Sequence, residues 1–387
     1  MSDQQPPSDP AAASRDQGRG AGSPARYDLR ALLALQNLMR LGVIGAVVAC
    51  SAGAFAYTAG WFSPGRLTQA RVADRLENVF GRHPGFRRNH AKGACFVGSF
   101  TSDGAGVSLS KAGVFRAGRT PVFGRFALAG GQPYQTDGPH AVRSMAVNFA
   151  LADGEVWRMA INDIPVFSVR NVQGFYDQLA ASRPDPRTGK PDPARMKAFL
   201  ASHPETARAM ALIKAQGFSS GFADASYNSL DAFRFVNAAG VSTPVRWSMV
   251  AEDPVKPDKP SSEDTRDGNY LFDDLVARVR QGPVRWKLVV TIGQPGDPTN
   301  DATLPWPSDR PRVEVGVLTV DQLMGEGHGP CRDINFDPLV LPSGITASDD
   351  PILSARSAVY STSFRRREGE PKSESPVHFN SGVQGAG

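Results

Sequence analysis

An unbroken apolar stretch near the N-terminus is the strongest feature of the hydrophobicity pattern. Residues 41–62 read LGVIGAVVACSAGAFAYTAGWF and include no charged side chain, and about 20 such residues can cross a bilayer as a helix. Three arginines, Arg26, Arg30 and Arg40, precede the stretch, and basic flanks favour the cytoplasmic side of a membrane. We therefore predict a single transmembrane helix in the cytoplasmic membrane over 41–62, with the rest of the chain on the periplasmic or extracytoplasmic side.

The segment in front of this stretch allows a second interpretation. Residues 1–27 are rich in Ser, Pro, Gly, Gln and Ala, and we predict a disordered cytoplasmic tail over 1–40. A cleaved secretory signal is the alternative, because Ala52-Gly53-Ala54 and Ala54-Phe55-Ala56 resemble cleavage sites. Cleavage would leave a free periplasmic domain. The long polar segment and the length of the apolar stretch favour an uncleaved anchor.

From residue 63 onwards the pattern is mostly that of β-strands. Residues 64–80 carry apolar side chains at helical spacing, but alternating apolar runs follow at 94–100, 122–128 and 143–169. Asp153-Gly154 separates two such runs, which is a strong signal of a β-hairpin. Since short turns join the strands without βαβ alternation, we predict an α+β fold built on an antiparallel sheet or barrel.

Helical spacing returns in the second half of the chain. The predicted helices lie within 174–217, interrupted by the proline-rich loop 183–193, and at 271–281 and 350–366. Residues 368–387 are polar, so we expect a flexible C-terminal tail there. This leaves residues 63–367 as the folded domain.

Composition excludes several classes of protein. The 387 residues are 41% hydrophobic and 21% charged, which suits a folded core rather than a disordered or fibrous chain. The formal net charge is only +5 and the charges are interspersed, so nucleic acid is not an expected partner. Cys50, Cys95 and Cys331 lie far apart, which excludes a zinc ribbon or a thioredoxin motif. A disulfide between Cys95 and Cys331 is compatible with an oxidising compartment.

One short segment points to chemistry. Residues 86–95, FRRNHAKGAC, place a histidine among basic residues, where it would ordinarily be a surface side chain. The segment resembles the distal-histidine motif of haem catalases, and in particular of the smaller catalase-related peroxidases. Four further segments resemble that family in the same order: GRFALAGG at 124–131, VRSMAVNF to INDIPVF within 142–167, YNSLDAFRFVNAAG at 227–240, and FDPLVLPSGITASDDPILSARSAVY at 336–360. The resemblance implies a haem-dependent, catalase-type antiparallel β-barrel with surrounding helices, and haem b as the cofactor.

The resemblance also implies roles for residues on both sides of the haem. Tyr360 matches the axial iron ligand, and tyrosine is the ligand that catalase uses. A phenol binds Fe(III) well only after it loses its proton, so a nearby positive charge is required. Arg356 lies one helical turn before Tyr360. His90 matches the distal base, which moves a proton between the two peroxide oxygens. The partners of the haem propionates are matched by Arg87, Arg125 and Arg367.

Two positions depart from the pattern of the larger catalases. Asp163 falls where the family has the distal asparagine, although a one-residue slip of the strand would put Asn162 there instead. Ala127 stands where the family has a serine that supports the distal histidine. An ionised Asp163 would repel hydroperoxide anion, and an alanine cannot hydrogen-bond the imidazole. Both changes imply that a second peroxide molecule reacts poorly as the reductant.

The expected function is therefore that of a haem peroxidase. The resemblance implies that hydrogen peroxide or an organic hydroperoxide is reduced with a small organic electron donor, and that catalase activity is weak. Two alternatives are the rearrangement of lipid hydroperoxides and haem binding without turnover. The sequence does not identify the donor, and it leaves open whether the chain forms a homo-oligomer.

Overall fold

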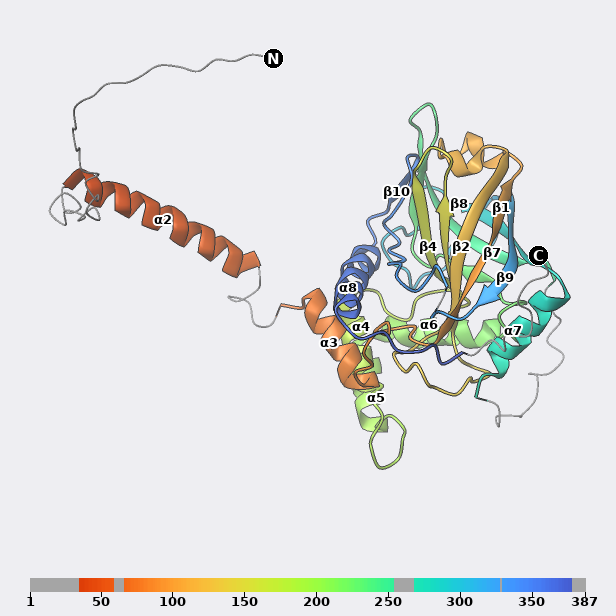
Figure 1. The fold of residues 1–387 in the computed structure, drawn as a ribbon, viewed down its shortest axis with the longest axis horizontal. Helices are drawn as coiled ribbons and strands as arrows, with labels where there is room; N and C mark the ends of the chain where they lie inside the picture. Colours follow the sequence, from red (N-terminus) through yellow and green to blue (C-terminus); the bar gives the residue numbers. More distant parts are fainter. Residues whose placement is uncertain (1–34, 59–65, 254–267, 328, 378–387) are drawn as a thin grey trace, which may run out of the picture. The chain divides into compact units, whose positions relative to one another are not determined.

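The structure is a computed structural model that describes residues 35–58, 66–253, 268–327 and 329–377 (Figure 1). The chain divides into two units, residues 1–66 and residues 67–387. The disordered tail predicted over 1–40 lies, as far as residue 34, outside the described residues.

The first unit contains one described helix, α2, which runs over Leu35–Thr58. It begins before the predicted start at residue 41, and the predicted last residues, 59–62, lie outside the described part of the chain. The span Gln36–Thr58 has a mean hydropathy of 1.8. Among the described residues, it is the one helix long and apolar enough to cross a membrane.

The second unit is built on antiparallel strands. Their bounds are β1 Gly93–Ser102, β2 Gly118–Leu128, β3 Arg143–Ala150, β4 Val156–Asn162, β5 Tyr227–Asn228, β6 Phe233–Val236, β7 Ser242–Ala251, β8 Val284–Ile292, β9 Arg312–Met324 and β10 Ile345–Ala347. Eight of them follow one another in the order β7-β5-β4-β3-β2-β1-β9-β8, and β8 pairs with β7 to close the ring. Strands β6 and β10 extend the sheet outward from β7. The closed antiparallel barrel confirms the predicted α+β fold.

The hairpin predicted at Asp153-Gly154 is also confirmed. Strands β3 and β4 pair antiparallel from Ser144 opposite Asn162 to Ala150 opposite Val156, with the turn between them. Gly154 has φ of 85°, a left-handed conformation that favours glycine.

The barrel interior is an apolar core rich in aromatic side chains. Trp157, Trp247 and Trp286 are buried there and pack with phenylalanines from several strands. Because successive side chains of a strand point to opposite faces, Met145 and Val147 of β3 point into this core, whereas Ser144 and Ala146 point outward. The outward face of β2 to β4 is therefore free to form one wall of a site.

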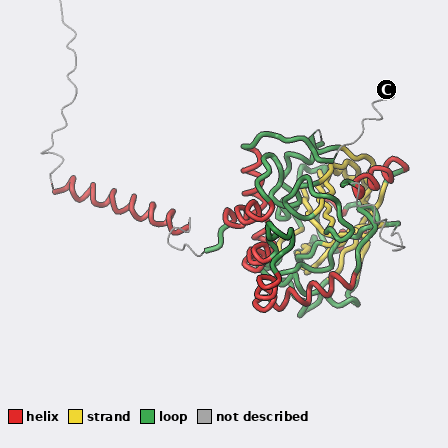
Figure 2. Tube along the Cα trace, turned by 90° about the horizontal axis from the view of Figure 1, so that it is seen from below, coloured by secondary structure: helices red, strands yellow, loops and turns green. Residues whose placement is uncertain are grey.

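Helices surround the barrel (Figures 1 and 2). Their bounds are α3 Gln69–Phe80, α4 Val172–Ala181, α5 Pro193–Ser202, α6 Pro204–Gln216, α7 Tyr270–Gln281 and α8 Pro351–Glu368, with two short 3-10 turns at Ala105–Ser108 and Gly113–Phe115. Helix α3 packs against α4 and α8. Helix α8 begins as predicted: Asp350 caps it by accepting a hydrogen bond from the Ile352 N–H at 2.9 Å, and Pro351 occupies its first turn.

The packed part of the chain extends beyond residue 368, where the sequence predicted a flexible tail. Glu370 accepts hydrogen bonds from Arg88 at 2.6 and 2.8 Å and from the Gly85 N–H at 2.9 Å. Val377 is buried against the main core. The tail prediction is therefore wrong for residues 368–377, because two buried partners hold them; residues 378–387 lie outside the described residues.

Cys95 on β1 and Cys331 form a disulfide across a sequence separation of 236 residues, while Cys50 in α2 is free and exposed. Closing so long a loop restricts the unfolded chain strongly. We expect Cys95→Ala/Cys331→Ala to lower the free energy of unfolding by about 2–5 kcal/mol in urea titrations, and Cys50→Ala to leave it unchanged. Detection of three free thiols in the unreduced, unfolded protein would contradict the disulfide.

Candidate active site

A cavity of about 270 Å³ lies between the outer face of β2 to β4 and the helices α3, α4 and α8. Its wall is mostly apolar, with polar side chains from the loop before β1, from the barrel face and from α8. Seven of the eight site residues predicted from the sequence line it: Arg87, His90, Arg125, Asn162, Arg356, Tyr360 and Arg367. The structure thus brings together residues that are up to 280 positions apart in the chain.

His90 is held in an unusual backbone conformation. Its φ is 54°, and Leu230 is the only other non-glycine residue of the described chain with a positive φ. The Asn89 side chain fixes this turn, because its Oδ1 accepts hydrogen bonds from the His90 N–H at 3.0 Å and from the Gly130 N–H at 2.9 Å. A strained backbone that is held in place by its neighbours is typical of functional sites.

The His90 ring is supported by a residue that the sequence analysis missed. The Oγ of Ser144 lies 2.9 Å from His90 Nδ1, and the same hydroxyl donates to Asn162 Oδ1 at 2.5 Å. The expectation that Ala127 leaves the imidazole without a hydroxyl partner is therefore wrong. Ala127 and Ser144 lie opposite each other on β2 and β3, so the hydroxyl comes from the neighbouring strand.

The electrostatic surroundings keep His90 neutral. The His90 side chain lines the cavity and is only partly exposed. Burial and, after it, the positive charges of Arg125, Arg356 and Arg87 together lower the pKa of His90 to about 3, against a smaller opposing effect from the Leu128 backbone. A neutral imidazole can accept a proton at physiological pH, which a distal base must do.

The structure distinguishes between the two candidates for the distal amide position. Asn162 lines the cavity, whereas Asp163 does not. Asp163 accepts a hydrogen bond from the Arg143 N–H at 2.9 Å and forms an ion pair with the Arg143 guanidinium at 3.4 Å. Burial raises the pKa of Asp163 to about 6, against the opposing effect of Arg143. Of the two alternatives that the sequence left open, it is Asn162 that lines the cavity, because strand alternation turns Asp163 to the other side.

Tyr360 and Arg356 lie one turn apart on α8. The Nη2 of Arg356 is 3.5 Å from the Tyr360 Oη and donates to the Ala160 carbonyl at 2.6 Å. Arg356 also forms an ion pair with Asp231, a fully buried carboxylate that the sequence analysis did not single out. Burial opposes the charge on Arg356, but Tyr360 and Asp231 outweigh it and raise the pKa of the guanidinium. The arginine is thus a fixed positive charge beside the phenol.

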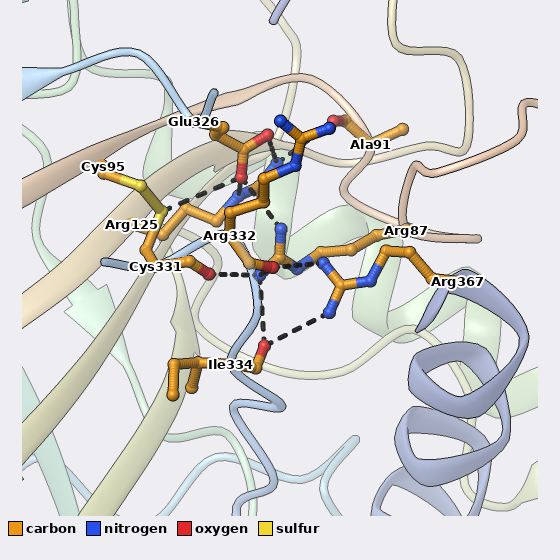
Figure 3. The surroundings of a disulfide bond; sticks show 9 residues. All are labelled: Arg87, Ala91, Cys95, Arg125, Glu326, Cys331, Arg332, Ile334 and Arg367. Carbon is orange, nitrogen blue, oxygen red and sulfur yellow. Dashed lines mark hydrogen bonds and ion pairs between the residues drawn. A yellow bond between two sulfur atoms is a disulfide. The ribbon is translucent and has the colours of Figure 1, made fainter. Parts of the chain in front are cut away.

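A second cluster of charges lies at the end of the cavity next to the disulfide (Figure 3). Glu326 forms ion pairs with Arg125 and, at 2.8 Å, with Arg87. Arg87 also donates to the Cys331 carbonyl at 2.7 Å, and Arg367 donates to the Arg332 carbonyl at 2.5 Å. Burial opposes ionisation of Glu326, yet Arg125 and Arg87 outweigh it and lower its pKa. Three guanidinium groups and one carboxylate give these four side chains a net charge of +2, and Asp333 is a further carboxylate that interacts with Arg87 and Arg367.

Most of the chain is similar in sequence to known proteins. The sequence model of a family described as Catalase matches residues 57–382. A protein named Catalase-related peroxidase from Synechococcus elongatus is 38% identical over 310 residues, which are 80% of this chain and 91% of that protein. Another of the same name, from Mycolicibacterium paratuberculosis, is 34% identical over 306 residues, covering 79% of this chain and 96% of that protein.

Solved catalases share the fold. A structure entitled "Structure of a bacterial catalase" superposes with a TM-score of 0.65 at 22% identity and covers 81% of this chain and 63% of that one. A fungal catalase structure gives a TM-score of 0.65 at 20% identity and covers 79% of this chain and 64% of that one. The chain therefore spans less than two thirds of the length of these catalases.

A haem is the cofactor that this family implies, and the residues present fit one. The surplus of guanidinium groups over carboxylates in the cluster around Glu326 suits the propionates of a haem. The Arg367 Nε is buried without a hydrogen-bond partner among the described residues, so the cluster has capacity for an added anion. Phe336, Ile352 and Val359 supply an apolar wall for a porphyrin, and Tyr360 offers an oxygen ligand for iron.

Proposed function

The chain belongs to the catalase family, and on that premise we propose that it is a membrane-tethered haem b peroxidase. Its substrates would be hydrogen peroxide or an organic hydroperoxide and a small organic electron donor. The observation that carries the proposal is the placement of a neutral His90, the Tyr360–Arg356 pair and a cluster with a surplus of guanidinium groups around one apolar cavity.

The distal residues would move and hold protons. When bound, a haem would supply the redox chemistry that breaks the peroxide O–O bond. His90 Nε2 would accept a proton from one peroxide oxygen and return it to the other, which leaves as water or an alcohol. Asn162 lies on the same wall, where its amide can orient the peroxide.

The proximal residues would hold a positive charge beside Tyr360, the proposed iron ligand. Arg356 places a positive charge 3.5 Å from the phenol oxygen, and Asp231 and the Ala160 carbonyl hold the guanidinium in position. The cluster of Arg87, Arg125 and Arg367 would bind the propionates, because planar guanidinium groups suit carboxylates.

The full reaction consumes one peroxide and two electrons from the donor. One hydroperoxide and one donor that gives up two hydrogen atoms yield one alcohol, one water and the oxidised donor. With hydrogen peroxide, the alcohol is replaced by another water. Two reasons for expecting weak dismutation no longer hold, because Asp163 lies outside the cavity and Ser144 supports His90. The preference for an organic donor therefore rests on the similarity to proteins named catalase-related peroxidase.

The anchor and the compartment are part of the proposal. Helix α2 is long and apolar enough to cross a membrane, and the arginines before it favour a cytoplasmic N-terminus. The Cys95–Cys331 disulfide supports an oxidising, extracytoplasmic location for the barrel domain. Proteolysis of intact spheroplasts tests this: the barrel domain should be accessible to added protease, and protection until lysis would contradict the topology.

The activity itself is tested with the purified, haem-loaded full chain. We expect hydrogen peroxide to be consumed rapidly only when a phenolic donor is present, and oxygen release without a donor to be slow. A fatty-acid hydroperoxide serves as a second substrate, and its rearrangement without donor oxidation would favour the lipid pathway. Failure to consume either peroxide with any of several phenolic donors would remove the enzyme proposal.

The low pKa of His90 predicts that the rate of the first peroxide step does not fall as the pH is lowered from 8 to about 5. With a pKa of about 3, the imidazole stays neutral as the pH falls through 6.5, the usual value for histidine. We therefore expect the second-order rate of the first peroxide step, measured by stopped flow, to be constant from about pH 5 to pH 8. A rate that halves near pH 6.5 would show an ordinary, solvated histidine.

A further inference from the structure

Three residues form a row across neighbouring strands on the wall of the cavity. Ala127 on β2 lies opposite Ser144 on β3, and Ser144 lies opposite Asn162 on β4. All three line the cavity. Directly opposed residues of an antiparallel pair point to the same face, with Cβ atoms about 5 Å apart. His90 reaches this row through its Nδ1, which lies 2.9 Å from the Ser144 Oγ.

The hydrogen bonds of this row have a direction. Ser144 donates its hydroxyl proton to Asn162 Oδ1 at 2.5 Å. A serine hydroxyl has a single proton, so toward His90 Nδ1 the same oxygen can only accept. The His90 proton must then be on Nδ1, which leaves the Nε2 lone pair free.

Asn162 is oriented by the same bond. Its Oδ1 is engaged by Ser144, and in the described part of the chain its Nδ2 has no hydrogen-bond partner although the residue lines the cavity. The amide therefore presents two N–H donors to whatever occupies the cavity. If the bonds ran the other way, the Asn162 nitrogen would face Ser144 and the proton would be on His90 Nε2. That arrangement would offer the peroxide neither a base nor an amide donor.

We propose that Ser144 is a positioning residue that sets both distal groups at once. It fixes His90 as the Nδ1–H tautomer, with Nε2 as the base, and it turns the Asn162 Nδ2 toward the peroxide. The proposal rests on the proposed function for its catalytic meaning, but the His90 tautomer can be measured without turnover. Ser144 on β3 thus supplies the hydroxyl that a serine in place of Ala127 on β2 would supply.

The opposed positions allow the hydroxyl to be removed and returned. Ser144→Ala removes it, and Ser144→Ala/Ala127→Ser supplies one from the neighbouring strand toward the same ring. Ser248→Ala is the matched control, because Ser248 also donates to an asparagine Oδ1, that of Asn228 at 2.7 Å, but has no part in the cavity wall. It removes a cross-strand hydrogen bond of the same kind, two strands further along the same row, in which His90 has no part.

Two measurements compare the variants with the parent protein. Nitrogen-15 NMR of the full chain with labelled histidines, with His90 assigned by His90→Gln, reports the tautomer without haem. Cyanide association with the haem-loaded ferric protein reports the base, because hydrogen cyanide must give up its proton on binding. In the parent protein we expect the His90 proton on Nδ1. In Ser144→Ala we expect a mixture of tautomers and about tenfold slower cyanide association. The double variant should recover both the tautomer and the cyanide association rate. Ser248→Ala should match the parent protein in both.

Each outcome decides the proposal. A proton on His90 Nε2 in the parent protein, or a Ser144→Ala variant with parental tautomer and parental cyanide kinetics, would overturn it. The same loss in Ser248→Ala would reduce the effect to general destabilisation and would also overturn it. If the NMR result holds but no peroxide is consumed, the positioning role stands and the proposed function fails.

Discussion

Replacing Tyr360 by phenylalanine is expected to remove nearly all bound haem from the purified protein. The substitution keeps the ring and deletes only the oxygen that would bind the iron, so α8 retains its packing. The propionate cluster and the apolar wall remain, and they should hold haem weakly and without its axial ligand. Haem content per chain, measured by the pyridine haemochrome assay, should fall from near one to below about a tenth.

A matched control separates ligation from general damage in that experiment. Tyr134 is 65% exposed and lies outside the cavity wall, so Tyr134→Phe should keep its haem. Circular dichroism should show that both variants retain the barrel. If Tyr360→Phe kept a full complement of haem with an unchanged absorption spectrum, the iron ligand would have to be a different residue.

Replacing His90 by glutamine is expected to slow the first peroxide step by about a thousandfold while haem stays bound. Glutamine has a similar reach and remains polar, but it cannot accept and return a proton as imidazole does. A positioned general base contributes typically 10²- to 10⁴-fold, and among the described residues that line the cavity His90 is the only histidine and none is an aspartate or glutamate. Stopped-flow mixing with hydrogen peroxide measures the rate directly.

The control for His90 is an exposed histidine. His140 lies outside the cavity wall, so His140→Gln should react at the parental rate. A His90→Gln protein with full haem content and a rate within threefold of the parent would mean that proton transfer does not depend on this residue. The haem could still be bound, but the distal assignment would be lost.

Local patterns in the sequence were sufficient to predict the main elements of the fold. The β3–β4 hairpin followed from a turn dipeptide between two alternating runs, and helix α8 from its spacing and its acidic entry. Both signals lie within a few consecutive residues, where turn chemistry and capping act directly. The short C-terminal segment 369–377 lacked such a signal, because its order depends on Arg88 and Gly85, which lie far away in the sequence.

The site was predictable where a motif carried it and not where partners come from distant strands. His90, Tyr360 and three of the arginines, Arg87, Arg125 and Arg356, lie in segments that resemble the catalase family, and Arg367 follows the last of these segments by seven residues. Glu326 is 201 positions from Arg125 and Asp231 is 125 positions from Arg356, so no local pattern could pair them. Ser144 meets His90 only through strand pairing, and the choice between Asn162 and Asp163 depends on a strand face that a one-residue slip reverses.

The account depends on an iron porphyrin that binds in this cavity with the Tyr360 oxygen as its ligand. Resonance Raman spectroscopy of the purified full chain, titrated with haemin, tests that bond directly. We expect saturation at one haem per chain and tyrosinate vibrations enhanced by excitation into the iron–phenolate transition, both absent from Tyr360→Phe. A chain that takes up no haemin, or a haem complex without tyrosinate bands, would contradict the account.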